Sequence, residues 1–262
     1  MEWALTVAIG LVCSDGVLVA SDSMGSSGKT AQSRIKVHAS EVSPTIWTYS
    51  GSQYTQQCIE RAIEESAKAG NDHHPDSVIP EVRESLRQAY DNLVCPPGTE
   101  ERELAAHAPD ILILGWHDGQ PSFRRLSGDL ASLDCDNERL VAVGSGRDYA
   151  AVVRASLAHY LDRPVGLHLG KVLAHRVIRI VCDVSSYNVA PPIQIAIADA
   201  SGARVLSTLE IAEVADLQDR WVAVESGTLE RAGDAGLKEV ANDLPSMRPG
   251  DRIGPSGANQ AS

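Results

Sequence analysis

The sequence has little of several features that particular protein classes require. Its 262 residues include only five cysteines, with no C-x-x-C pair, which argues against a disulfide framework and a zinc site. Aromatic residues make up only 4%, so the core must be aliphatic. A Lys/Arg-rich run is missing and the formal net charge is -12, whereas nucleic-acid-binding proteins present a basic face to phosphate.

Long apolar runs are missing as well. No stretch approaches the roughly 18 uninterrupted apolar residues of a membrane span, and the N-terminus carries Glu2 and no basic segment, unlike a secretory signal. With 43% hydrophobic and 22% charged residues, the composition is that of a globular protein. We therefore expect a cytoplasmic protein with reduced thiols that binds neither membranes nor nucleic acid.

The hydrophobic pattern changes period four times along the chain. Short runs rich in β-branched and aliphatic residues, separated by turn residues, predict strands over 5–13, 17–21, 34–39 and 45–50. Helical spacing of apolar residues predicts helices over about 58–70 and 77–93. Strands over 110–116, 122–126 and 139–143, helices over 147–161 and 167–182, and a strand over 193–199 follow. This order favours an α+β fold, a four-layer α-β-β-α sandwich of two antiparallel sheets between helix pairs.

We expect one domain over residues 6–244, because no Pro/Gly/Ser-rich linker divides the middle of the chain. The composition of residues 245–262 predicts a disordered tail.

Three residues near the N-terminus form a candidate catalytic group. Thr6 opens the first predicted strand and Asp22 follows the second strand of the same hairpin, so the two lie side by side. Lys36 falls inside the third predicted strand, where a charge needs a partner, and Asp22 is the obvious one. A hydroxyl beside such a pair is a candidate nucleophile, because the cation stabilises the alkoxide. If Thr6 were the first residue, its α-amine, with an ordinary pKa of about 7.7–8.0, would be a competent base.

Five segments in order resemble proteasome beta subunits, which are N-terminal-nucleophile (Ntn) hydrolases, and their bacterial relatives. The run TVAIGLVCSDGVLVASD, from Thr6 to Asp22, is similar to that family's opening strand-turn-strand. Arg34-Ile-Lys36-Val resembles the segment that bears the family's lysine. The other three segments are Tyr49-Ser50-Gly51, Gly144-Ser145-Gly146 and Asp183-Val-Ser-Ser186, and the resemblance spans roughly residues 5–199.

The resemblance implies a threonine peptidase that works through an acyl-enzyme. The Thr6 hydroxyl attacks a peptide carbonyl, the Thr6 amine shuttles the proton, and the Gly51 N–H holds the oxyanion. The residues that position the amine would be Ser145, Asp183 and Ser186.

The family also implies a setting for this chemistry. Tyr49 and Gln53 would flank the specificity pocket, and no cofactor or metal is needed. The implied partners are a peptide or unfolded-protein substrate, further copies of the chain in a homo-oligomeric ring, and an ATPase unfoldase.

Residues 1–5 stand between the printed start and the nucleophile. Family members that process themselves usually carry Gly before the threonine, whereas this chain has Leu5. Either these residues are a leader that is removed, or translation begins at the Leu5 codon and the new Met is cleaved, or Thr6 stays blocked. The last case would make the chain a catalytically inactive ring or scaffold subunit, and a small-substrate amidase on the same fold is a further alternative.

Two other motifs suggest different chemistry. Gly25-Ser-Ser-Gly28-Lys29-Thr30 resembles a phosphate-binding loop but lacks its leading glycine, and strand-like residues follow it. Asp72-His73-His74 has no second ligand pair at helical spacing, so we interpret it as a solvated loop. The sequence contains neither H-E-x-x-H nor G-x-S-x-G, which disfavours a metalloprotease and an α/β-hydrolase.

Overall fold

Two five-stranded antiparallel sheets form the centre of the protein. The computed structural model describes residues 6–27, 30–51, 53–68, 74–89, 109–127, 131–185 and 189–243. The first sheet has the order β10-β1-β2-β11-β12. Its strands are β1 (Ala8–Val12), β2 (Val17–Ser21), β10 (Leu140–Val143), β11 (Gln194–Asp199) and β12 (Gly202–Val205).

The second sheet has the order β5-β6-β7-β8-β9. Its strands are β5 (Val37–Ala39), β6 (Thr45–Ser50), β7 (Asp110–His117), β8 (Gln120–Leu126) and β9 (Ser132–Asp134). A separate hairpin of β3 (Met24–Ser27) and β4 (Thr30–Ser33) joins the two sheets along the chain. The sequence did not predict this hairpin, and the strand predicted over 34–39 begins only at Val37.

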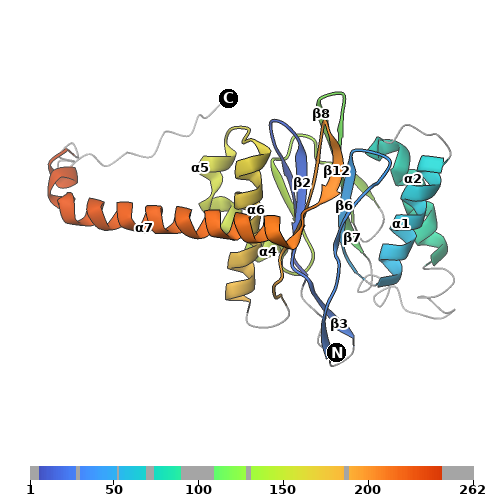
Figure 1. The fold of residues 1–262 in the computed structure, drawn as a ribbon, viewed down its shortest axis with the longest axis horizontal. Coiled ribbons are helices and arrows are strands. Elements are labelled where there is room, and N and C mark those ends of the chain that lie inside the picture. Colours follow the sequence, from blue (N-terminus) through green and yellow to red (C-terminus); the bar gives the residue numbers. More distant parts are fainter. Residues whose placement is uncertain are drawn as a thin grey trace, which may run out of the picture. The chain divides into compact units, whose positions relative to one another are not determined.

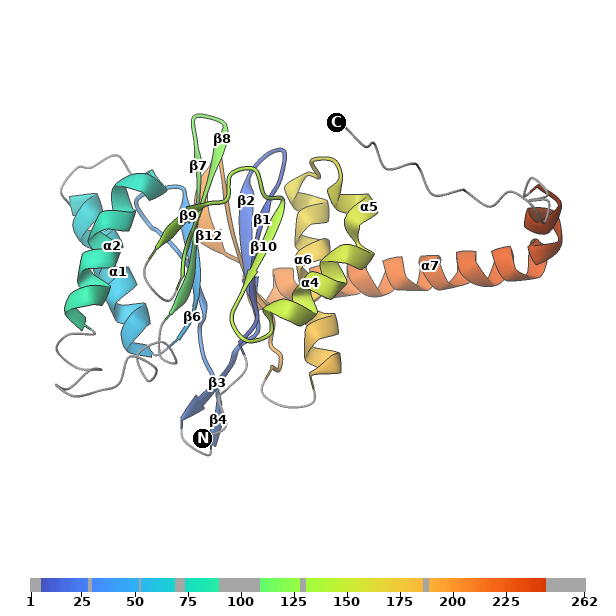
Figure 2. The same ribbon diagram turned by 180° about the vertical axis from the view of Figure 1, so that it is seen from behind.

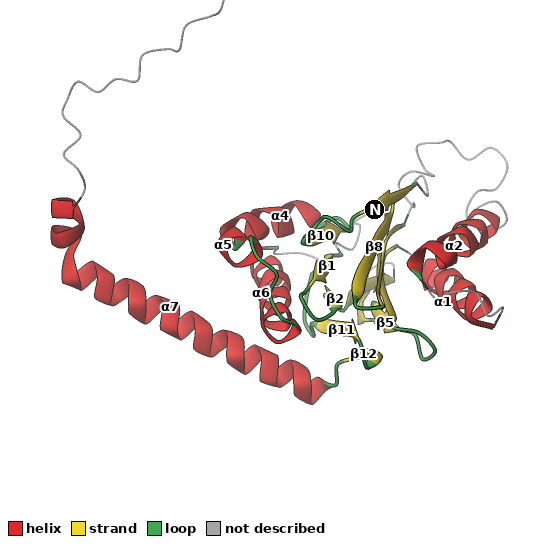
Figure 3. Ribbon diagram, turned by 90° about the horizontal axis from the view of Figure 1, so that it is seen from above, coloured by secondary structure: helices red, strands yellow, loops and turns green. Residues whose placement is uncertain are grey.

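Helices cover both outer faces of the sheet pair. In Figures 1 and 2, α1 (Gln53–Lys68) and α2 (Pro75–Ala89) lie beside the second sheet. On the side of the first sheet lie α4 (Arg147–Ser156), α5 (Ala158–Leu161) and α6 (Leu167–Val184). The view from above in Figure 3 shows the same succession of helices, sheet, sheet and helices. The predicted four-layer α+β sandwich is thus confirmed, although the helix predicted over 147–161 is broken at Leu157.

Alternating side chains explain the layers. In β1, Ala8 and Val12 point into the core between the sheets, where they meet Leu112, Leu114 and Phe123 of the second sheet. The opposite face of the second sheet buries Trp47, Tyr49, Ile111 and Ile113 against apolar residues of α1 and α2. Since β1, β2, β6, β7 and β11 are buried on both faces, apolar and polar residues alternate little along these strands. The core is thus mostly aliphatic, as the composition predicts, and it also contains Trp47, Tyr49, Trp116 and Phe123.

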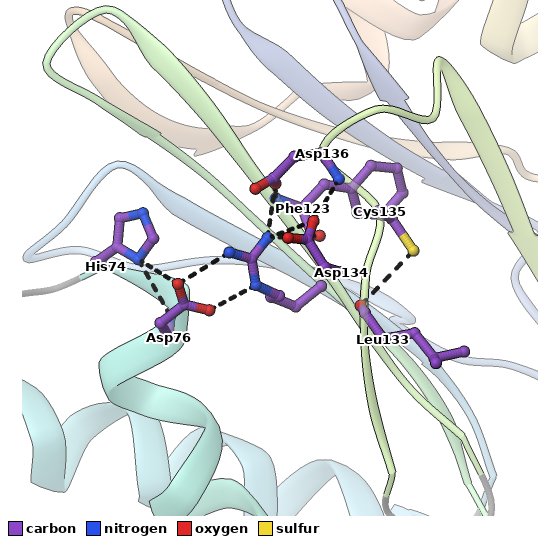
Figure 4. Close-up of polar contacts among 8 residues, drawn as sticks. His74, Asp76, Phe123, Leu133, Asp134, Cys135 and Asp136 are labelled. Atoms are coloured by element: carbon purple, nitrogen blue, oxygen red, sulfur yellow. Dashed lines mark hydrogen bonds and ion pairs between the residues drawn. The ribbon is translucent and has the colours of Figure 1, made fainter.

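An arginine links α2 to the second sheet. Figure 4 shows Asp76 of α2 on one side of a guanidinium and Asp134 and Asp136 on the other. That guanidinium belongs to Arg124 of β8, whose Nε and Nη2 donate to the two Asp76 oxygens at 2.5 and 2.9 Å. Its Nη1 lies 2.7 Å from Asp136 Oδ1. The bidentate contact fixes the beginning of α2 against the strand.

The remaining helix, α7 (Thr208–Asp243), was not predicted from the sequence. The chain divides into two compact units, residues 1–218 and 219–262, so α7 begins in the first and continues into the second. Ser207 and Glu210 form a capping box at its start: the Ser207 N–H donates to Glu210 Oε2 at 2.8 Å, and the Glu210 N–H donates to Ser207 Oγ at 3.3 Å. That serine and glutamate, three residues apart, were the sequence signal for this helix.

Among the described helices, none is long and apolar enough to cross a membrane. The expected leader over residues 1–5 and the expected disordered tail over 245–262 lie outside the described residues.

Candidate active site

The first hairpin brings Thr6 and Asp22 together. Ala8 of β1 pairs with Ser21 of β2, so the residues just beyond this pair, Val7 and Asp22, are neighbours. The Val7 N–H donates to Asp22 Oδ1 at 3.0 Å, and the Ser21 hydroxyl donates to the Val7 carbonyl oxygen at 2.9 Å. The carboxylate therefore lies directly beside the residue that follows Thr6.

Lys36, from the segment just before β5 of the second sheet, contacts both Thr6 and Asp22. Its Nζ donates to Asp22 Oδ1 and Oδ2 at 3.0 Å each and to Thr6 Oγ1 at 3.1 Å. All three ammonium donors are used in this way. The hydroxyl, ammonium and carboxylate groups that the sequence predicts to form a cluster lie together in the structure. Lys36 lies immediately before β5, however, and not inside a strand as predicted.

Burial governs the electrostatics of this cluster. Asp22 is fully buried and Lys36 is 5% exposed. Burial lowers the pKa of the Lys36 ammonium, and the Asp22 carboxylate opposes that shift. Burial likewise raises the pKa of the Asp22 carboxyl, opposed first by Lys36 and then by the N–H groups of Val7 and Met24. The lysine is thus held as a less basic cation than one in water, next to a hydroxyl.

A glycine-serine-glycine turn holds the backbone of Thr6. The Thr6 N–H donates to Ser145 Oγ at 3.0 Å, and the Gly146 N–H donates to the Thr6 carbonyl oxygen at 3.0 Å. Gly144 has a φ of 86°, and a Cβ there would stand 2.3 Å from the Thr6 carbonyl oxygen. Only glycine fits at that position, because both the conformation and the space exclude a side chain.

Gly51, Tyr49, Gln53 and Ser186 are further site residues predicted from the sequence. Gly51 follows β6 with a φ of 153°, a conformation that favours glycine. The Tyr49 hydroxyl donates to Gln56 Oε1 of α1 at 2.8 Å, and burial raises its pKa to about 12. Gln53 begins α1, but its side chain lies outside those the structure describes, as does the whole of Ser186.

Asp183 lies in the last turn of α6 and has a partner on the same helix. Its side chain is 64% exposed and its Oδ2 lies 3.5 Å from Arg179 Nε, one turn earlier in α6. This i,i+4 pair gives the carboxylate a local ion-pair partner.

A cavity of about 290 Å³ is lined in part by Gly144 and Ser145 of the glycine-serine-glycine turn. Ser145, whose hydroxyl contacts the Thr6 nitrogen, lines it together with Ser50, Asp110 and Arg147. Asp110 pairs with Arg125 at 3.0 Å. No sequence signal pointed to the cavity, since its walls come from three separate parts of the chain, at Ser50, at Asp110 and at 144–148.

The two competing motifs have other structures. Residues on both sides of Gly28-Lys29 belong to strands β3 and β4, so no helix begins where a phosphate-binding loop requires one. Of Asp72-His73-His74 only His74 is described, and its Nδ1 accepts a hydrogen bond from the Asp76 N–H at 3.3 Å. Within the described ranges no group of three or more His, Cys, Asp or Glu side chains could hold a metal ion.

The four-layer arrangement of this chain is shared with solved structures of Anbu proteins. The solved structure of Anbu from Yersinia bercovieri, described as an ancestral beta-subunit, is similar with a TM-score of 0.65 at 13% identity, over 93% of this chain and 99% of that chain. A Gly-1 mutant of Anbu from Hyphomicrobium sp. strain MC1 has a TM-score of 0.65 at 13% identity, over 86% of this chain and 96% of that chain. No family model and no curated protein matches the sequence. At this identity the similarity establishes the fold alone.

Proposed function

We propose that the protein is a threonine peptidase that hydrolyses peptide bonds through an acyl-enzyme on Thr6, when Thr6 is the first residue of the processed chain. The observation that carries the proposal is the cluster in which the Lys36 ammonium contacts both Thr6 Oγ1 and Asp22. The Ser145 hydroxyl at the Thr6 nitrogen adds a partner for a free amine.

In the proposed acylation, Thr6 Oγ attacks the carbonyl carbon of a peptide bond and the carbonyl π electrons move to the oxygen. The Oγ proton passes to the α-amine of Thr6, since an α-amine with a pKa of about 7.7–8.0 is partly neutral at cellular pH. The intermediate collapses by breaking the C–N bond, and the protonated Thr6 amine gives its proton to the departing amine. An ester of Thr6 remains.

In the proposed deacylation, water attacks the ester carbon and gives its proton to the same amine. The C–Oγ bond breaks, the proton returns to Oγ, and a carboxylic acid leaves. Lys36, 3.1 Å from Oγ1, stabilises the negative charge that develops on that oxygen in both steps. The Gly51 N–H would serve the oxyanion, while Ser145 would orient the amine.

Other parts of the proposal come from the resemblance. Tyr49 and Gln53 would lie near the substrate side chain, and the substrate would be a peptide or an unfolded protein. The chain would act in a homo-oligomeric cytoplasmic ring, supplied by an ATPase unfoldase. Ser186 and Asp183 would support the amine in the assembled, processed enzyme only if Asp183 leaves Arg179.

Substitution of the nucleophile tests the proposal. We expect Thr6→Ala to reduce hydrolysis of a fluorogenic peptide mixture to background while the mass of the assembly, measured by light scattering, stays the same. Thr228→Ala, at an exposed threonine of α7, is the matched control and should keep wild-type activity. Unchanged hydrolysis in Thr6→Ala would show that another residue is the nucleophile.

Intact-mass analysis separates this proposal from the alternative of a catalytically inactive ring subunit in which residues 1–5 block Thr6. A chain that begins at Thr6 supports the peptidase. A chain that keeps residues 1–5 and shows no hydrolysis supports the inactive subunit.

A further inference from the structure

The backbone that carries Lys36 lies between two strands and belongs to neither. β4 ends at Ser33 and β5 begins at Val37, so Lys36 and Arg34 lie outside the strand ladders. β5 is also the edge strand of its sheet. A four-carbon side chain on such a segment needs another support if its ammonium is to keep three hydrogen bonds at once.

The side-chain amide of Gln194 supplies that support from the opposite sheet. Its Oε1 accepts a hydrogen bond from the Lys36 N–H at 2.8 Å, and its Nε2 donates to the Arg34 carbonyl oxygen at 2.6 Å. One amide thus bonds the backbone on both sides of Ile35, as a neighbouring strand would. Gln194 is separated along the chain by 158 positions from Lys36 and by 160 positions from Arg34.

Gln194 also pairs with β2, the strand that ends just before Asp22. It is the first residue of β11 and pairs with Ser21 of β2, the residue before Asp22. The same residue therefore sets the Lys36 backbone against the strand that presents the carboxylate. One residue of β11 thus contacts the backbone of Lys36 and pairs with the residue before Asp22, the other member of the buried ion pair.

We infer that Gln194 is a positioning residue, whose amide holds the Lys36 backbone where the ammonium reaches Thr6 and Asp22 together. The inference rests on the proposed function, because it assigns a role in that same reaction. A misplacement of about 1 Å in a catalytic group costs about 10²-fold in rate. Losing the amide should therefore lower kcat much more than it alters KM, since both hydrogen bonds of the Gln194 amide are to the backbone of the segment that carries Lys36.

Gln194→Met tests the inference, because methionine keeps the length of the side chain and loses both hydrogen bonds. We expect hydrogen exchange at the Lys36 amide, resolved by fragmentation of peptic peptides, to accelerate about 10-fold or more, and kcat to fall about 10- to 100-fold. KM should change by less than about threefold on the same reasoning. Gln120→Met, an exposed glutamine at the β7–β8 turn, is the control and should match the wild type in all three measurements.

Gln194→Glu adds a readout that a merely structural role would not move. Glutamate keeps an acceptor for the Lys36 N–H, so exchange at that amide should stay slow, but it loses the donor to Arg34. A carboxylate beside Lys36 favours the protonated ammonium and so raises its pKa. The pH profile of kcat should accordingly move to higher pH in this variant while the fold, measured by thermal unfolding, remains.

The outcomes are distinct. Slow exchange at Lys36 in Gln194→Met, or fast exchange with an unchanged kcat, overturns the inference even if hydrolysis depends on Thr6. Hydrolysis that survives Thr6→Ala overturns the proposed function instead, and with it any catalytic role for Gln194.

Discussion

Replacing Lys36 by methionine tests what the ammonium does in the cluster. Asp22 is fully buried, and Lys36 donates to both of its oxygens at 3.0 Å. Removing one partner of a buried pair typically costs about 3–5 kcal/mol of unfolding free energy, because the remaining charge is left in a low dielectric. The same change removes the donor 3.1 Å from Thr6 Oγ1, and loss of one preorganised donor typically lowers kcat by about 10²–10³.

The double variant Lys36→Met/Asp22→Asn separates these two effects. Asparagine keeps an oxygen for the Val7 N–H and removes the unpaired charge, so most of the lost stability should return. The lost activity should not return, because the donor to Thr6 is still missing. Urea unfolding and peptide hydrolysis measure the two quantities on the same samples. A kcat of Lys36→Met within a few-fold of the wild type would refute the reasoning, and so would a restored kcat in the double variant.

Three further predictions follow from particular contacts. Gly144→Ala should destabilise the fold and abolish hydrolysis, because its Cβ would stand 2.3 Å from a backbone oxygen. Gly119→Ala is the control, since Gly119 has a φ of 75° and open space around it, and it should lower the free energy of unfolding in urea by only about 1 kcal/mol. Arg124→Lys removes the bidentate contact, since lysine cannot bind both Asp76 oxygens in the same way. The free energy of unfolding should fall by roughly 1.5–3 kcal/mol, which is typical for the loss of one hydrogen bond to a charged group, and an unchanged urea midpoint would contradict this. Burial raises the pKa of the Cys13 thiol from 9.0 to about 12, so the stability it contributes is present below pH 9 and is lost as the pH rises toward 12. Between pH 9 and 10.5, Cys13→Ala should therefore lose less stability per pH unit than the wild type, by up to about 1.4 kcal/mol, and equal slopes would count against the shift.

Local signals explain which parts of the fold could be predicted. The hairpin of β1 and β2 has apolar strands around Ser14-Asp15-Gly16, so its register and the adjacency of Thr6 and Asp22 follow from neighbouring residues. The β3–β4 hairpin lacks that apolar alternation, being built mostly from glycine, serine and other small or polar residues, and it was missed. Helix α7 was missed although its capping box was visible in the sequence.

Within the site, the need of a buried lysine for an opposite charge was sufficient to pair Lys36 with Asp22 from the sequence alone. The orientation of Asp183 was not predictable, because it depends on which face of the last turn of α6 meets solvent and on the nearby Arg179. Gln194 carried no signal at all, since a glutamine at the start of a strand is ordinary until the opposite sheet places an unpaired backbone beside it. Contacts between the two sheets are what a single sequence encodes least directly.

The most direct measurement is the site at which a threonine-directed electrophile attaches, mapped by mass spectrometry of the wild type and of Lys36→Met. We expect one adduct per chain, on Thr6, that forms in the wild type and is reduced about 10²-fold or more in rate when the ammonium is removed. An adduct on any other residue, or equal labelling of Thr6 in the two proteins, would contradict a Thr6 nucleophile activated by Lys36.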